Sequence, residues 1–346
     1  MLEKSDSRFN GCPDLARLPY FRINESGRLV ARREEIGEVI DFHTHLGMTF
    51  ALAGKLNLGI KTPRIDYFFP YDHTFDLNEY SARSFSAEAA KKCAQECTKA
   101  AWSSRGYMRT HTVPNIIEDM DRIGVSHAVT HAIEYPGLSD NTGAFLRAAV
   151  GQKRLVVFGS VHPYSGNIEQ KIKRMIELGA KGMKLHPAMQ LFRASNKRAY
   201  KIYELCEHYR LPMLFHTGAS DIAPKWQEDL PAIRHFREPV RDFPNAIFIF
   251  GHAGIHLYEE AVELGKKHEN VYLEISGQPP HRIKKMIEGM GQDRILFGSD
   301  WPFYAIEMPL AKALIATEGM EGIRRKLLAE NAKRLMRSIF GVSSPI

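Results

Sequence analysis

The sequence predicts a distorted (β/α)8 barrel, also called a TIM barrel, and three observations predict this fold class. Apolar runs bounded by turn residues recur between residues 37 and 346, as expected for strands buried on both faces. Amphipathic stretches separate these runs, so that strand and helix patterns alternate. Several runs also end directly before a polar residue, which is the position where α/β barrels carry their active sites.

The predicted strands and helices follow one another along the chain after an N-terminal hairpin. A short hairpin comes first, because residues 20–23 and 28–31 flank the turn sequence Asn24-Glu25-Ser26-Gly27. The first barrel strand follows at 39–45, and the other strands are predicted at 126–133, 155–161, 182–186, 211–216, 246–252, 271–276 and 295–300. Helical periodicity covers 86–103, 115–123, 140–150, 168–178, 197–209, 258–267, 280–290 and 320–340, and a further helical segment opens at 231–236.

This pattern implies one barrel with additions. We expect an N-terminal extension over residues 1–36, a TIM-barrel domain over 37–346, and an insertion at 46–112 after the first strand. A connection of that length in a compact domain is usually functional. Because it leaves the barrel where the first strand ends, it must emerge at the catalytic mouth, and its aromatic and basic side chains, Arg64 and Tyr71 among them, fit a cover that contacts substrate. The alternative is that the insertion forms a dimer contact or only packs against the barrel without contacting substrate.

Composition excludes several classes of protein. With 346 residues, 44% hydrophobic and 25% charged, the chain resembles an ordinary soluble globular protein with a large core. The net charge of +7 could indicate a nucleic-acid partner, but the basic residues are scattered, so solvated helix faces are the preferred interpretation and no nucleic acid is expected.

The location of the protein is predicted from what the sequence lacks. It has no apolar signal segment near Met1 and no apolar stretch of about 18 residues, so we expect neither secretion nor a membrane span. Its four cysteines form no CxxC pair and are interpreted as free thiols in a reducing cytoplasm. The expected partners are a small-molecule substrate and, optionally, a second copy in a homodimer.

Polar residues at the ends of four apolar runs are the candidate functional group. They are His43 and His45 after residues 38–42, His216 after 211–215, His252 after 246–251, and Asp300 after 295–299. Two histidines two positions apart on a strand leave the same face and can bind one cation. Imidazole plus carboxylate suits Zn²⁺ best, with Fe²⁺, Mn²⁺ or Co²⁺ as alternatives, and leaves a position at which water is activated. A nearby carboxylate can move the proton.

These residues lie in motifs that resemble the amidohydrolase superfamily, and within it the amidohydrolase-related branch that includes relatives of aminocarboxymuconate semialdehyde decarboxylase. The motifs are Asp41-Phe42-His43-Thr44-His45, Gly182-Met183-Lys184-Leu185-His186-Pro187, His216-Thr217-Gly218, Gly251-His252-Ala253-Gly254, Phe297-Gly298-Ser299-Asp300-Trp301-Pro302 and Glu330-Asn331-Ala332. The resemblance implies that His43, His45, His216 and Asp300 bind one metal ion. It also implies that His252 orients or activates water and that Asp300 transfers the proton.

Other residues near these motifs keep more than one interpretation. In binuclear members of the superfamily, a lysine on the fourth strand is carbamylated and bridges two metals, whereas an ammonium at Lys184 could hold a substrate carboxylate. His186 either faces the pocket or satisfies a turn. Trp301 is expected to shape the loop after Asp300 and to form a wall of the pocket. Glu274 either faces the barrel mouth or pairs with a lysine.

The function predicted from these residues is hydrolysis of a C–N or C–O bond by metal-activated water in a small molecule, which we expect to be carboxylated. The alternative on the same scaffold is a metal-dependent non-oxidative decarboxylase, in which a carbon is protonated instead. A binding protein that kept the barrel without catalysis is a third class, which the intact set of five residues disfavours.

Overall fold

The computed structural model of the protein describes residues 7–346, and its centre is a sheet of eight parallel strands. The strands are β4 (Val39–Thr44), β6 (Val125–His131), β7 (Leu155–Gly159), β8 (Gly182–Leu185), β9 (Met213–His216), β10 (Phe248–Gly251), β11 (Val271–Glu274) and β12 (Ile295–Leu296). Strands that are adjacent in the sheet are also consecutive strands of the barrel along the chain. Consecutive parallel strands joined by helices are the arrangement expected of a (β/α)8 barrel.

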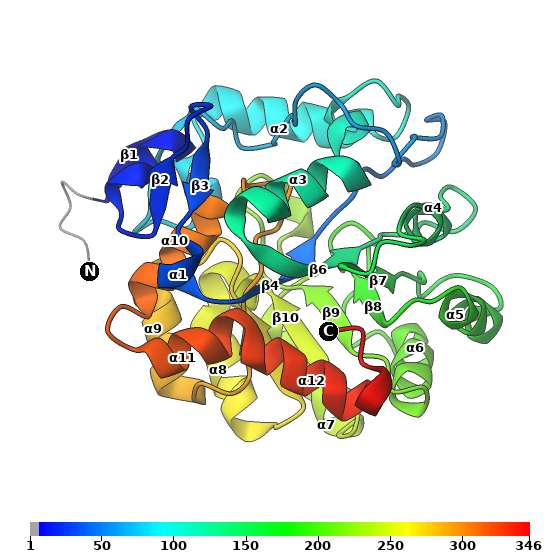
Figure 1. The fold of residues 1–346 in the computed structure, drawn as a ribbon. Coiled ribbons are helices and arrows are strands. Elements are labelled where there is room, and N and C mark those ends of the chain that lie inside the picture. The colour runs from blue at the N-terminus through cyan, green and yellow to red at the C-terminus, as the bar shows by residue number, and fades with distance from the viewer. Residues whose placement is uncertain (1–6) are drawn as a thin grey trace.

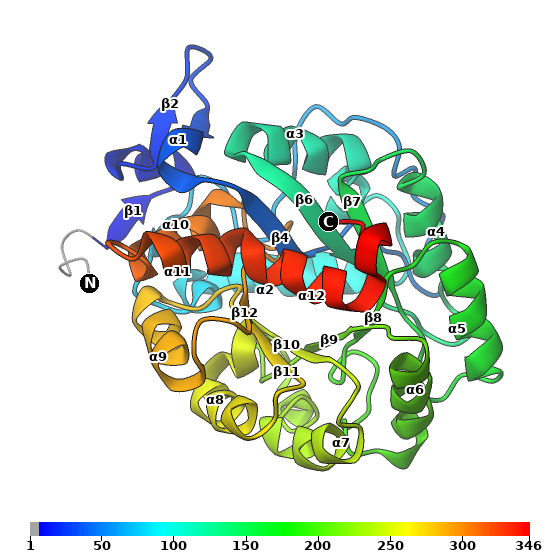
Figure 2. The same ribbon diagram turned by 60° about the horizontal axis from the view of Figure 1, so that its bottom comes forward.

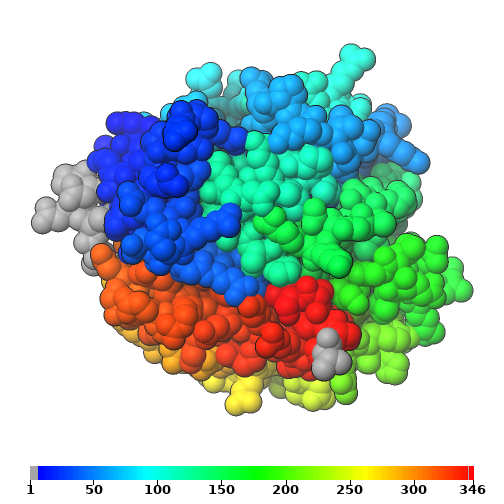
Figure 3. Space-filling model, in the orientation of Figure 1, coloured from blue at the N-terminus to red at the C-terminus, as the bar shows by residue number. Residues whose placement is uncertain are grey.

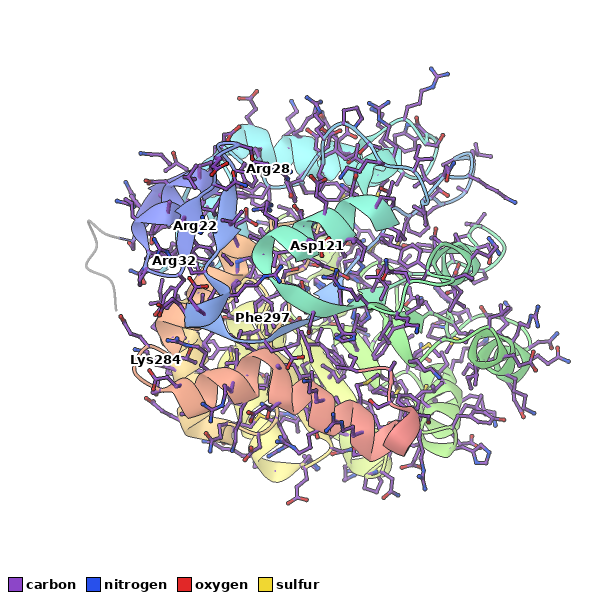
Figure 4. All side chains as sticks on the ribbon, in the orientation of Figure 1. Arg22, Arg28, Arg32, Asp121, Lys284 and Phe297 are labelled. Atoms are coloured by element: carbon purple, nitrogen blue, oxygen red, sulfur yellow. The ribbon has the colours of Figure 1, made fainter. Side chains whose placement is uncertain are left out.

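The barrel closes between its first and last strands. The N–H of Phe42 on β4 donates to the carbonyl of Phe297 at 2.8 Å, and Thr44 forms a parallel bridge with Trp301. Phe297 lies beside β4 in Figure 4. The sequence predicts a strand as far as residue 300, but β12 is only two residues long and ends at Leu296. The chain then continues to Asp300, which adopts a positive φ of 61°. The predicted fold class is confirmed.

Helices surround the barrel (Figure 2). They are α3 (Val113–Ile123), α4 (Asn141–Ala148), α5 (Ile168–Glu177), α6 (Lys197–His208), α7 (Arg237–Asp242), α8 (Tyr258–Lys267) and α9 (Pro280–Met290). After β12 come α10 (Glu307–Ala316), α11 (Glu321–Arg325) and α12 (Asn331–Phe340). The helix predicted over 320–340 is divided, because a π-helical turn at Lys326–Glu330 separates α11 from α12.

The two ends of the barrel are covered differently. Helix α12 crosses one end, where Leu335 and Met336 pack with Ile40, Phe42 and other apolar side chains of the strands. The insertion, with α2 (Ala87–Lys99), lies over the opposite end (Figures 1 and 2). The N–H groups of Phe68 and Phe69 donate to the carbonyls of Pro302 and Phe303, which follow β12.

The N-terminal segment is joined to both the insertion and the barrel. The predicted hairpin is present as β2 (Phe21–Ile23) paired with β3 (Leu29–Ala31), and α1 (Arg33–Ile36) leads into β4. Before it, β1 (Arg8–Asn10) pairs with β5 (Thr74–Asp76) of the insertion. On the face shown in Figure 3, the N-terminal residues lie next to the C-terminal helices. Short 3-10 helices occupy connections at Cys12–Arg17, Ser81–Ser84, Tyr107–Thr110, Lys225–Gln227, Ile233–Phe236, His252–Leu257 and Gly341–Ser343.

Within residues 7–346, none of the helices combines the length and the apolar character needed to cross a bilayer.

Candidate active site

Strand β4 delivers two histidines to the end of the barrel that the insertion covers. His43 and His45 point to one side of the strand, with ring centroids 5.1 Å apart. Asp300, which follows β12, lies between them: its Oδ1 is 3.8 Å from Nε2 of His43 and 3.4 Å from Nε2 of His45. The three residues are buried, and one ligand atom from each falls within 4.8 Å of the other two. This is a group of suitable size to hold one metal ion.

Partners outside this group orient both rings. The Nδ1–H of His43 donates to Glu274 at 2.6 Å, and the Nδ1–H of His45 donates to the carbonyl of His131 at 2.8 Å. Burial, with Lys184 adding to it, lowers the pKa of His43 well below its usual value and that of His45 to about 3, so both rings are neutral. Each Nε2 therefore carries a lone pair, and each lies within 3.8 Å of Oδ1 of Asp300. A carboxylate or carbonyl behind each imidazole is the usual support of a metal ligand.

Glu274, at the end of β11, has a role that the sequence left open. It has no lysine partner among residues 7–346; instead it accepts hydrogen bonds from His43, from the backbone of His252 and from Ser276. Burial raises the pKa of Glu274 to about 8, while the hydrogen bonds lower it. Because every one of these partners donates, the geometry requires the ionised carboxylate. Glu274 directly follows an apolar run, as His216 does, and this position in the sequence pattern could have identified it as a site residue.

His252 begins a strained turn after β10. Its φ is 62°, and Ala253 and Ile255 also have positive φ values of 46° and 54°. The side-chain amide of Gln278 holds both ends of the turn, donating to the carbonyls of His252 at 2.8 Å and Ile255 at 2.9 Å. The turn is thus fixed by a buried side chain that sequence reasoning missed, since Gln278 lies in no recognisable motif.

Ser276 sets the orientation of the His252 ring. Its hydroxyl donates to Glu274 at 2.9 Å and therefore accepts from Nδ1–H of His252, 2.8 Å away. In the neutral ring, Nε2 of His252 is then a hydrogen-bond acceptor. The ring centroid is 4.9 Å from that of His43, so His252 lies beside the group that could bind metal.

Asp300 and Lys184 place opposite charges at the centre of the site. Burial raises the pKa of Asp300 to about 7, against the effect of Lys184. Burial also lowers the pKa of Lys184 to about 8, against the attraction of Asp300 and Glu274. The Nζ of Lys184 is 2.9 Å from Nε2 of His43. The lysine thus reaches the centre of the site, where an anionic group or a carbamate would lie next to His43.

His216 and His186 form the more open side of the site. Their rings stack at 4.1 Å with an interplanar angle of 9°, and both side chains are partly exposed. The structure brings three of the four expected metal ligands together within 4.8 Å, whereas His216 is not in that group and lies next to His252 at 4.6 Å. Nδ1 of His186 accepts a hydrogen bond from the N–H of Met189, so the ring proton is on Nε2.

Arg64 and Tyr71, which are expected to contact substrate, have other neighbours in the structure. Arg64 is 79% exposed and pairs with Asp66. The hydroxyl of Tyr71 donates to Glu307. Arg64 and Tyr71 line a cavity of about 480 Å³ between the hairpin and α3, and none of the clustered histidines lines it. In Figure 4, Arg28, another residue of this cavity, is seen near α3.

Trp301 lies in the loop after Asp300, which it is expected to shape. Its side chain is fully buried, and its indole N–H donates to Asp119 on α3 at 2.9 Å. Trp301 therefore anchors the loop that carries Asp300 to the neighbouring helix. On the other side of Asp300, Asp41 of β4 accepts hydrogen bonds from the backbone and hydroxyl of Ser299. These two contacts fix the loop from both sides.

Comparison with known proteins gives a family and a set of structures with the same fold. A family model described as Amidohydrolase matches residues 109–337. A search of curated proteins found no match.

Several solved structures resemble the chain. An uncharacterised TIM-barrel protein from Bordetella bronchiseptica has a TM-score of 0.61 at 17% identity, over 87% of this chain and 99% of that chain. The 5-carboxyvanillate decarboxylase of Novosphingobium aromaticivorans, complexed with manganese and 4-hydroxy-3-methoxy-5-nitrobenzoic acid, has a TM-score of 0.57 at 17% identity, over 88% and 97%. A probable 2-pyrone-4,6-dicarboxylic acid hydrolase of Acinetobacter baumannii has a TM-score of 0.51 at 14% identity, over 86% and 98%. At these identities the likeness shows the shared fold.

Proposed function

Since the chain belongs to the amidohydrolase family, we propose that it is a metal-dependent hydrolase that cleaves a C–N or C–O bond of a small, carboxylated molecule. The observation that carries the proposal is the group formed by His43, His45 and Asp300, whose ligand atoms lie within 4.8 Å of one another. Two neutral imidazoles with deprotonated Nε2 atoms, of which that of His43 lies 2.9 Å from Nζ of Lys184, and one carboxylate oxygen are a donor set that divalent transition metals prefer.

The proposed cofactor is one divalent ion, Zn²⁺ in the first place and Fe²⁺, Mn²⁺ or Co²⁺ otherwise. His43, His45 and Asp300 would hold it, with His216 as the further ligand. When bound, such an ion polarises substrate oxygen and lowers the pKa of water toward neutrality. The hydrogen bonds from His43 to Glu274 and from His45 to the His131 carbonyl support this assignment, because they leave each Nε2 deprotonated.

The other residues would handle protons and orientation. Asp300 takes the proton from the attacking water and returns it to the leaving group, which requires a carboxylate beside the reacting oxygen. Nε2 of His252 accepts a hydrogen bond from the same water and orients it, since Ser276 occupies Nδ1 at 2.8 Å. The ammonium of Lys184 binds the substrate carboxylate, and the Nε2–H of His186 is a further donor on the open side.

The second candidate is a metal-dependent non-oxidative decarboxylase. The similarity to a 5-carboxyvanillate decarboxylase favours it. In this reaction the bond between carbon and the carboxylate breaks, carbon dioxide leaves, and Asp300 donates a proton to the carbon. The same residues serve both reactions, so their positions do not distinguish the two.

Product analysis distinguishes the two reactions. Zinc- and manganese-loaded protein is incubated with 2-pyrone-4,6-dicarboxylate, with 5-carboxyvanillate and with pooled esters, amides and lactones that carry a carboxylate, while carbon dioxide release is recorded. We expect hydrolysis products without carbon dioxide, and none from Asp300→Asn, which keeps the fold but not the proton carrier. Carbon dioxide release that depends on Asp300 would replace the hydrolase by the decarboxylase. Metal-loaded protein that is inactive on the whole panel would leave neither proposal supported.

A further inference from the structure

A cavity outside the candidate active site lies where the hairpin, the insertion and α3 meet. Its volume is about 480 Å³, which is within the range of cavities that hold small molecules. Leu29 of the hairpin, Arg64 of the insertion and Arg122 of α3 are among the residues that line it. The hairpin lies beside α3 (Figures 1 and 2). Because no candidate metal ligand lines this cavity, a molecule bound here would not compete with the metal.

Two tyrosine rings form an aromatic wall of the cavity. Tyr67 and Tyr71 both line it, and their rings stack with centroids 5.8 Å apart and an interplanar angle of 24°. The hydroxyl of Tyr67 donates to Asp119, and that of Tyr71 donates to Glu307 at 2.8 Å. Since both hydroxyls are occupied, the two side chains offer their rings to a molecule in the cavity. Such rings pack favourably against another flat ring.

Two arginines of the cavity have hydrogen-bond donors to spare. The Nε of Arg64 pairs with Oδ1 of Asp66 at 2.8 Å, and Nη1 of Arg28 pairs with Glu118. Within residues 7–346, the other nitrogens of these two guanidinium groups have no acceptor. The side chains are 79% and 48% exposed, so they can turn toward a ligand. A guanidinium group matches the two oxygens of a carboxylate.

The rim of the cavity carries an excess of positive charge. Glu118 lies between Lys61 and Arg28, and each of these cations binds one of its oxygens. Their hydrogen bonds lower the pKa of Glu118, so it is ionised. Two cations beside one carboxylate leave one positive charge, whereas Arg64 is balanced by Asp66. The rim therefore favours an anion over a cation.

Arg122 has a different role from the two arginines at the rim. All five of its N–H groups are already bonded: they donate to Asp119, to Glu307 and to the carbonyl of Leu29, at distances between 2.8 and 3.3 Å. The same two carboxylates hold the hydroxyls of the tyrosine wall. The wall is therefore fixed before any ligand arrives, which lowers the entropy lost on binding.

We propose that this cavity is a second binding site of the protein, for a small aromatic carboxylate. Its ring would lie against Tyr67 and Tyr71, and its carboxylate would accept hydrogen bonds from the guanidinium groups of Arg28 and Arg64. The inference goes beyond the proposed function and does not depend on it, because the cavity shares no residue with the group of candidate metal ligands.

Three matched ligands test the two parts of the site. The aromatic acid 2-naphthoate has both the flat ring and the charge, 2-naphthamide has the ring without the charge, and cyclohexanecarboxylate has the charge without the flat ring. Each is titrated calorimetrically into the full-length protein. We expect 2-naphthoate to bind about ten-fold more tightly than either of the others, because only it uses both the wall and the guanidinium groups.

A double variant locates the binding. Arg28→Ala combined with Arg64→Ala should weaken the binding of 2-naphthoate about ten-fold and leave that of 2-naphthamide unchanged. The matched control combines Arg147→Ala with Arg174→Ala, which removes two other exposed, ion-paired arginines and the same charge. The control should bind 2-naphthoate as wild type does.

Three results would overturn the second site. They are no binding of 2-naphthoate to wild-type protein, equal affinity for the three ligands, or equal affinity of wild type and the Arg28→Ala/Arg64→Ala variant for 2-naphthoate. The last result is also the one expected if 2-naphthoate binds only at the mouth of the barrel. All three concern the cavity, so they leave the proposed function to its own test of metal content and products.

Discussion

His43 on β4 and His45 directly after it are each oriented by a hydrogen bond at Nδ1, which leaves Nε2 deprotonated. His43 is oriented by Glu274 and His45 by the carbonyl of His131. The sequence motif predicts the pair but not its supports, because those come from β11 and β6, far along the chain. Removing a support should therefore change how the pair binds a cation without removing any ligand.

Glu274→Gln tests this at the residue that supports His43. A glutamine turns one acceptor oxygen into an amide donor, which would meet N–H and O–H donors from His43, His252 and Ser276. We expect the affinity for Zn²⁺ to fall about 10- to 100-fold, measured by competition with a chromogenic chelator. Glu118→Gln on the surface of α3 is the control. A Zn²⁺ affinity equal to that of wild type would show that the support has no function.

Asp300 and His252 should respond differently to substitution. We expect Asp300→Asn to lose activity by orders of magnitude and to keep its fold and much of its metal, because the amide cannot take up a proton. His252→Asn should also lose activity but keep nearly all of its metal, since His252 lies beside the group of His43, His45 and Asp300. Metal content is measured by elemental analysis and activity on the substrate found in the panel. If His252→Asn lost its metal as completely as His43→Ala, His252 would be a direct ligand.

At the scale of elements, a buried ionic network joins the hairpin, α3, α10 and the insertion. The guanidinium of Arg122 donates to Glu307 at 2.8 and 3.1 Å and to Asp119 at 2.9 Å. Tyr71 donates to Glu307, and Tyr67 and Trp301 donate to Asp119. Arg122 is the only cation bonded to these two carboxylates in the part of the chain that is described, so the network depends on it.

Arg122→Met should destabilise the protein strongly. The change leaves Asp119 and Glu307 buried without a cation, and breaking such a group typically costs about 3–5 kcal/mol. Arg28→Ala is the matched control, because its ion pair with Glu118 is exposed, with side chains 48% and 33% accessible, and such pairs contribute about 1 kcal/mol or less. The free energy of unfolding is measured in urea. Equal losses in the two variants would contradict this account of the network.

The elements that the sequence predicts well are those with a clear period. The helices at 258–267 and 280–290 have the predicted bounds, because each has one buried face and one exposed face. Helix α10 was missed because every one of its residues is buried, including Glu307 and Lys312, so no period marks it. The pairing of β1 with β5 was missed as well, since contact between short segments that far apart leaves no local signal.

The candidate site could be predicted in part for the same reason. His43, His45 and Asp300 end apolar runs, and a parallel barrel brings such ends together. Arg64 and Tyr71 could not be placed, because the insertion has no period that fixes the direction of its side chains. They line a cavity beside α3, and Tyr80 of the same insertion reaches the loop after β11 instead.

At the scale of the whole molecule, the two ends of the barrel differ in structure and in proposed function. Helix α12 seals one end with apolar side chains, while the insertion covers the end that carries His43, His45 and Asp300 (Figures 1 and 2). This division concentrates charged and ionisable groups at one end, where burial keeps the imidazoles neutral and available to a cation. The molecule is therefore organised around one site, and the central claim is that this site binds a metal ion.

Metal stoichiometry tests that claim most directly. Wild-type protein, His45→Ala and the control His127→Ala are each loaded with Zn²⁺, freed of excess ion and analysed by mass spectrometry of the elements. We expect close to one ion per chain in wild type and in the control, and almost none in His45→Ala, because the group within 4.8 Å then loses a ligand. A stoichiometry of two would indicate a second ion bridged by carbamylated Lys184. Zinc-free wild-type protein, or His45→Ala that binds as much zinc as wild type, would contradict the claim.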